Sequence, residues 1–197
     1  MFHENKFIQT IKAPQLHKRI KHGYIILDIE PSSDNQSIFW LHMTEFNADG
    51  TIVSSKDIVN IDASQYNPDK QAHMLEELDR PFSELKSSKL AMRRQARDFF
   101  TRARRRLPIF IYGRALDPRL LATLLRNQMV DLIDLQTVYA NTTHQNTPAL
   151  AMVAEIMTGG VVTREHLDNH SPIEDVRLTN IVLQGLVKTN TINYQTK

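Results

Sequence analysis

Two carboxylates stand one residue apart behind an apolar run. Asp28 and Glu30 follow the hydrophobic residues 24–27. Because side chains alternate along a strand, both acids are predicted to point to the same face. Two neighbouring acids repel each other, whereas Mg²⁺ and Mn²⁺ prefer carboxylate oxygens. The pair therefore indicates a divalent-metal site, and the alternative is only the solvated end of a strand.

Two further segments carry acids where helices are predicted to begin. Asp117 follows a short apolar run and precedes Pro118, a residue favoured in the first turn of a helix. His170 lies just ahead of the last predicted helix, and Asp175 lies within its first turns. Such an acid could hold a metal ion while the histidine takes a proton from water. Each acid alone could equally be a helix cap, because Asp favours helix N-termini.

The elements that must position these residues alternate between strands and helices. The predicted strands cover residues 24–30, 37–46, 51–54, 108–112 and 130–135. The predicted helices cover residues 81–106, 118–126, 146–157, 163–168 and 173–186, with a short one around 7–11. This order predicts an α/β domain whose mixed sheet of about five strands is flanked by helices.

Composition limits the chain to ordinary globular classes. Its 197 residues are 41% hydrophobic and 23% charged, which fits one domain with a full core. No apolar run reaches the length of a membrane span, and the first residues carry no signal-peptide core. There is no cysteine, which excludes disulfides and thiolate zinc sites. We expect a cytoplasmic protein without a membrane partner.

Positive charge is unevenly placed along the chain. Seven arginines fall within fourteen residues: Arg93, Arg94, Arg97, Arg102, Arg104, Arg105 and Arg106. Clustered arginine is typical of nucleic-acid binding, and a solvated helix face is the alternative. Residues 1–22 are predicted to form a basic arm that attracts a nucleic-acid backbone together with this helix. The remaining residues are predicted to form a domain over 23–187 and a polar C-terminal tail over 188–197.

Together, the acidic segments resemble the DEDDh family of 3′–5′ exonucleases, the proofreading type with an RNase H-like fold. The first motif of that family, Asp-x-Glu at the end of the first strand, matches Asp28 and Glu30. The second, an Asp between a short strand and a helix, matches Asp117. The third, a His followed five residues later by an Asp, matches His170 and Asp175. The resemblance covers residues 23–187.

The resemblance implies two divalent metal ions, Mg²⁺ or Mn²⁺, held by Asp28, Glu30, Asp117 and Asp175. One ion would activate the attacking water and the other would stabilise the leaving 3′ oxygen. His170 would be the general base, since histidine titrates near neutrality. The implied substrate is a single-stranded 3′ end of DNA or RNA, and the product is a nucleoside 5′-monophosphate. DNA is favoured over RNA, although the sequence alone does not decide between them. The implied protein partner is a polymerase or another replication or repair protein, and the oligomeric state stays open.

The chain departs from the family after its first motif. The family usually continues with Thr-Thr-Gly, whereas Pro31 stands here and has no backbone N–H to donate. Ser32 or Ser33 would have to bind the terminal nucleotide instead.

The second motif departs as well. Where the family has His-Asn and then Phe, this chain has Gly113-Arg114 and Leu116. Arg114 could contact a phosphate, and Leu116 could give apolar contact without base stacking. Both departures support an alternative function, a catalytically weak RNase H-like module that binds nucleic acid as an accessory subunit.

Three other residues are predicted to be structural. Trp40 lies within an apolar strand and is expected in the core. His42 has no ligand spacing to another histidine and is expected to be a surface or a structural residue, and Asp134 ends a short strand. The pair Gly159-Gly160 is predicted to stop a helix.

Overall fold

The computed structural model describes residues 8–9, 11–31, 38–59, 88–102, 107–113, 117–124, 132–144, 146, 148–161 and 171–195. Of these, residues 8–9, 89, 101–102, 117–118, 122–123 and 190–195 are described by their backbone alone. The strands are β1 (Ile8–Gln9), β2 (Tyr24–Pro31), β3 (Ile38–Phe46), β4 (Ile52–Val59), β5 (Ile109–Ile111) and β6 (Leu132–Asp134). The helices are the 3₁₀ helix η1 (Ala13–Gln15), α1 (Leu16–Arg19), α4 (Lys89–Arg102), α5 (Asp117–Leu124), α6 (Leu135–Thr143), α7 (Leu150–Thr158) and α8 (Pro172–Gln195).

Within the described ranges, six strands form one mixed sheet in the order β1-β6-β5-β2-β3-β4. β2, β3 and β4 are an antiparallel meander, while β5 pairs parallel with both β2 and β6. The hairpin turn between β3 and β4 forms at Gly50, whose φ of 89° favours glycine. In the same turn, the backbone N–H of Thr51 donates to Asp49 and lowers the pKa of that carboxyl. The mixed sheet flanked by helices is confirmed.

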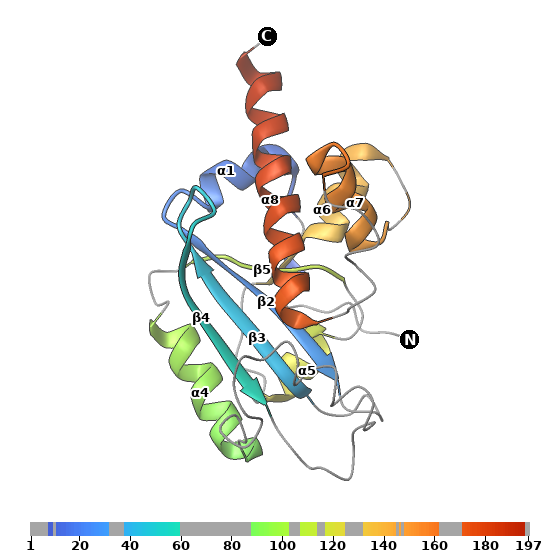
Figure 1. Ribbon diagram of the computed structural model, residues 1–197. Helices are drawn as coiled ribbons and strands as arrows, with labels where there is room; N and C mark the ends of the chain where they lie inside the picture. Colours follow the sequence, from blue (N-terminus) through green and yellow to red (C-terminus); the bar gives the residue numbers. More distant parts are fainter. Residues whose placement is uncertain are drawn as a thin grey trace.

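Helices cover both faces of the sheet (Figure 1). Along β2, Tyr24 and Ile26 join one core cluster with side chains of α6, α7 and α8. Ile25, Leu27 and Ile29 join a second cluster with side chains of α4 and α5. The alternation of β2 therefore places its odd- and even-numbered side chains against different helices.

The N-terminal segment is part of the core. Ile11, Ala13, Leu16 and Ile20 are buried in the cluster that α8 completes. The described basic residues of this segment stay exposed: Lys12, His17, Lys18, Arg19, Lys21 and His22. The helix predicted around 7–11 is wrong, because Ile8–Gln9 pairs with β6 as strand β1.

Two helical segments of the structure are absent from the predictions. α6 begins where the Asp134 side chain accepts from the backbone N–H groups of Gln136 and Thr137. α8 continues beyond the sheet to Gln195 (Figure 1), so most of the predicted polar tail from residue 188 is helical. α7 ends at Gly159 with a φ of 64°, which confirms the predicted stop. The predicted helix over 163–168 lies outside the described residues.

In the part of the chain that the structure describes, no helix has both the length and the apolar character needed to cross a membrane.

Candidate metal centre

Asp28 and Glu30 lie at the end of a central strand of the sheet. β2 is paired on both sides, antiparallel with β3 and parallel with β5. The intervening Ile29 is buried against α4 and α5, so both acids point to the opposite face, where they are half-buried. The strand register shifts directly after Glu30. The prediction that the two carboxylates share one face is confirmed.

Asp175 lies in the first turn of α8, as predicted. The Ser171 hydroxyl oxygen accepts from the backbone N–H of Glu174 at 3.2 Å, and the Ser171 carbonyl accepts from that of Asp175 at 2.9 Å. Pro172, next to this buried serine, occupies the position where proline favours helix starts. Glu174 accepts a hydrogen bond from Arg177 Nε, and this bond raises the pKa of the Arg177 guanidinium. Asp175 itself is half-buried.

Contacts further along α8 fix its position over the sheet. The Tyr24 hydroxyl donates to Asn180 Oδ1 and accepts from Gln184 Nε2, so this part of α8 lies over the beginning of β2. Asp175 precedes Asn180 by five residues, about 7.5 Å along a helix axis. Asp28 follows Tyr24 by four residues, about 13 Å along a strand. Figure 1 shows that α8 runs in the opposite direction to β2, so its first turn, which holds Asp175, lies toward the strand end that carries Asp28.

Asp117 is described by its backbone alone. It begins α5, six residues after the end of β5 at Ile111. Because β5 is parallel to β2, with Ile26 opposite Phe110, the two strands end at the same edge of the sheet. α5 also contacts β2 and β3. The backbone of Asp117 thus follows β5, whose end lies beside that of β2. That its carboxylate binds a metal ion stays a prediction.

The other predicted site residues lie outside the described part of the chain: His170, Ser32, Ser33, Arg114 and Leu116. Pro31 is described and is the last residue of β2, just past the register shift.

The acidic side chains that the structure describes at this site carry the oxygen ligands that suit a hard divalent cation. Asp28, Glu30 and Asp175 supply carboxylate oxygens, the ligands that Mg²⁺ and Mn²⁺ prefer. Among the side chains that the structure describes, no three His, Asp or Glu residues are grouped closely enough to hold an ion. The predicted fourth ligand, Asp117, is not among those side chains. The chemistry of these donors therefore fits such an ion, and their convergence on one ion stays a prediction.

Asp134 has structural contacts. Its buried carboxylate caps α6 through Gln136 and Thr137 and also accepts from the backbone N–H of Gly113 at 3.0 Å. Gly113 directly precedes the predicted substrate contact Arg114. Next to it, burial raises the pKa of Tyr112, whose hydroxyl donates to the Pro148 carbonyl.

The described part of the arginine-rich helix lies on the other side of the sheet from the two acids. Met92 and Ala96 of α4 pack in the cluster that contains Ile29, whereas Arg94 and Arg97 are exposed. Arg93 donates to the carbonyl of Leu124 at 2.6 Å, which joins α4 to α5. The described arginines of α4 therefore do not belong to the sheet face that carries Asp28 and Glu30.

Comparison with known proteins gives the fold. No protein-family model and no curated protein matches the sequence. A solved structure of exonuclease I matches with a TM-score of 0.56 at 16% identity, over 87% of this chain. The S. pombe protein Pop2p, solved in an Mg²⁺- and Mn²⁺-bound form, matches with a TM-score of 0.51 at 9% identity. That match covers 96% of this chain and 93% of Pop2p.

The two matches differ in the share of the known protein that they cover. The chain spans 42% of the exonuclease I chain, so it corresponds to less than half of that protein. At these identities the comparisons show the fold. The chain has the RNase H-like fold that the sequence predicts, and it shares this fold with exonuclease I and Pop2p.

Proposed function

We propose that the protein is a metal-dependent 3′–5′ exonuclease that removes nucleoside 5′-monophosphates from single-stranded nucleic acid, preferably DNA. One observation carries the proposal: Asp28 and Glu30 share a face at the end of a central strand, on the side covered by the helix that presents Asp175. Support comes from the fold, because exonuclease I and a metal-bound Pop2p share it.

The residues would divide the work as follows. Asp28, Glu30, Asp117 and Asp175 would hold two divalent ions, which supply water activation and stabilisation of the leaving 3′ oxygen. β2 fixes the spacing of the first two acids because both positions are paired with β3, Asp28 opposite His42 and Glu30 opposite Trp40. His170 would accept the proton of the attacking water. Ser32, Ser33, Arg114 and Leu116 would contact the terminal nucleotides.

The first test is hydrolysis of matched DNA and RNA oligomers of one sequence, labelled at the 5′ end, with Mg²⁺ or Mn²⁺. The wild type should give a ladder of shortening labelled products, faster on DNA. Asp28→Asn should remove this activity, because one proposed ligand is lost while the side-chain volume stays the same. Asp98→Asn is the matched control, since Asp98 is an exposed acid on α4.

Three results would contradict the proposal. A labelled mononucleotide as first product would reverse the direction of digestion. Equal rates with and without a divalent cation would remove the metal from the mechanism. Unchanged hydrolysis by Asp28→Asn would remove this site from it.

A second function, a nucleic-acid-binding accessory module, is favoured by one feature. Pro31 stands at the register shift beside Glu30 and provides no backbone donor for a terminal nucleotide. A melting experiment separates the two functions, because a bound ligand raises the melting temperature. Mn²⁺ should raise it for the wild type and not for Asp28→Asn. Oligonucleotide binding without a Mn²⁺ effect and without hydrolysis would identify the accessory module.

A further inference from the structure

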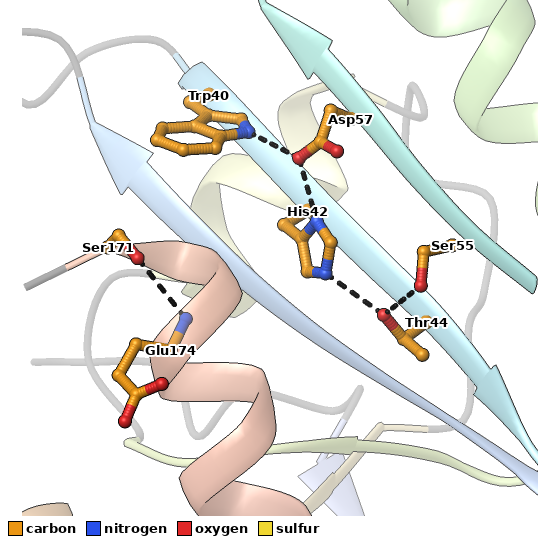
Figure 2. Close-up of polar contacts among 7 residues, drawn as sticks. All are labelled: Trp40, His42, Thr44, Ser55, Asp57, Ser171 and Glu174. Atoms are coloured by element: carbon orange, nitrogen blue, oxygen red, sulfur yellow. Dashed lines mark hydrogen bonds and ion pairs between the residues drawn. The ribbon is translucent and has the colours of Figure 1, made fainter. Parts of the chain in front are cut away.

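Five hydrogen-bonded side chains extend across β3 and β4 (Figure 2). Asp57 Oδ1 accepts from Trp40 Nε1 at 2.8 Å and from His42 Nδ1 at 2.7 Å. His42 Nε2 lies 2.9 Å from Thr44 Oγ1, which lies 2.9 Å from Ser55 Oγ. We refer to these residues as the Asp57 network: Trp40, His42, Thr44, Ser55 and Asp57.

The network assigns one proton of His42, the one on Nδ1. A carboxylate can only accept hydrogen bonds, so Nδ1 of His42 donates to Asp57. In the neutral imidazole, Nε2 then accepts from the Thr44 hydroxyl, whose oxygen is left to accept from Ser55. Both ring nitrogens of His42 are thus used inside the network. A buried polar network with its bonds satisfied holds its members in one arrangement.

The connectivity Thr44–His42–Asp57 is that of a nucleophile, a base and an acid. Thr44, however, is only 2% exposed, so a substrate cannot reach its hydroxyl. His42 is also buried, and the Asp57 side chain is 23% exposed. The network is therefore no hydrolytic triad, and its effect has to pass through the residues beside it.

The residues beside it are the two proposed metal ligands. In the register of β2 and β3, His42 lies opposite Asp28, and Trp40 lies opposite Glu30. Asp57 in turn lies opposite His42 on β4. Directly opposite residues share a sheet face, with Cβ atoms about 4.5–5.5 Å apart. The two rings that one oxygen of Asp57 binds are thus the cross-strand neighbours of the two carboxylates.

We propose that Asp57 is a positioning residue for Asp28 and Glu30. By binding Trp40 and His42 through one oxygen, it fixes both rings, and fixed rings limit the side-chain conformations open to the acids beside them. The inference rests on the proposed function, because its effect is to hold two carboxylates at the spacing that a divalent ion needs. Mutation of a residue that orients the ligands of a metal ion typically lowers the metal affinity about 10- to 100-fold, which sets the scale of the effect expected for Asp57.

The test compares Asp57→Ala with Thr44→Val in the full chain. Both variants remove bonds of the network, but Thr44 lies opposite Ile26, which is no proposed ligand. Both should melt at a lower temperature than the wild type without metal. The apparent Kd for Mn²⁺, taken from the rise in melting temperature with Mn²⁺ concentration, should increase at least about tenfold in Asp57→Ala only.

Kinetics give a second measurement. In Asp57→Ala, the Mn²⁺ concentration for half-maximal nucleotide release should rise by the same factor, while the KM for the oligonucleotide stays at the wild-type value. If Asp57→Ala does not fold, Trp40→Phe takes its place, because it removes one of the two bonds to Asp57 and keeps most of the ring. A smaller rise in the Kd for Mn²⁺ is expected there.

Two outcomes overturn the inference alone: a wild-type Kd for Mn²⁺ in the Asp57 or Trp40 variant, or an equal rise in Thr44→Val. In both, the network would only stabilise the fold. Failure of the proposed function has a different signature, because the wild type itself would then show no Mn²⁺-dependent melting shift and no nucleotide release. That result would overturn both proposals.

Discussion

The two faces of β2 differ in how they change along the strand. The face toward α4 and α5 is apolar throughout, with Ile25, Leu27 and Ile29 all buried. The opposite face begins with Tyr24 and Ile26 under α8 and then changes to acids. Apolar burial drives folding, whereas neighbouring acids do not. The contrast teaches that stability and the proposed chemistry are carried by different side chains of one strand.

The largest expected effects come from one substitution on each face. Ile25→Ala deletes a side chain that is 1% exposed and should lower the free energy of unfolding by about 2–5 kcal/mol. Glu30→Gln should change it by less than about 1 kcal/mol. It should nevertheless lower kcat about a thousandfold, because bound metals contribute several kcal/mol to the transition state and each 1.4 kcal/mol is tenfold.

Urea unfolding and nucleotide release measure the two quantities on the same samples. Ile25→Ala, assayed where it is still folded, should keep most of its activity. The comparison between the faces fails if Glu30→Gln loses as much stability as Ile25→Ala, since the acids would then be part of what holds the fold together.

Local sequence signals predicted β2 and the first turn of α8. The alternation around Asp28 depends on neighbours in the chain, and so does the cap that Ser171 gives to α8. The placement of α8 over β2 could not be predicted from one sequence. It depends on Tyr24 and Asn180, which are 156 positions apart and meet only in the folded chain.

Asp57 was missed for a related reason. The predicted third strand stopped at residue 54, whereas β4 continues through polar residues to Val59. Residues 54–57 have low strand propensity and become a strand because they pair with β3. One signal was available: Ser55 and Asp57 are spaced to share a face with each other, as Trp40, His42 and Thr44 are on the neighbouring strand.

A smaller effect, a pH dependence of the free energy of unfolding, is expected from Tyr24 at the apolar beginning of the face under α8. Burial raises the pKa of Tyr24 to about 12, although Gln184 partly offsets this, while an unfolded tyrosine titrates near 10. Between these pH values the folded chain binds more protons than the unfolded one. The free energy of unfolding should therefore fall as the pH rises from about 10 to 12.

Tyr24→Phe tests this assignment, because it keeps the ring that stacks on Phe46 at 5.2 Å and removes the titrating hydroxyl. Urea unfolding across this pH range should show a shallower fall for the variant. Some fall should persist, since the pKa of Tyr112 is raised as well. An identical slope in both proteins would mean that Tyr24 does not cause it.

The smallest effect is expected on the far side of the sheet. Arg94 and Arg97 are exposed on α4, whose buried side packs against the apolar face of β2. A packed layer is about 10 Å thick, and at 0.15 M salt charges are screened over about 8 Å. Removing both arginines should therefore change kcat/KM for a very short single-stranded oligomer by less than about twofold. With long strands, a loss that disappears at high salt would show that α4 binds the distant part of the substrate. A large loss on the short oligomer would instead place these charges near the scissile bond and end the separation between the two faces.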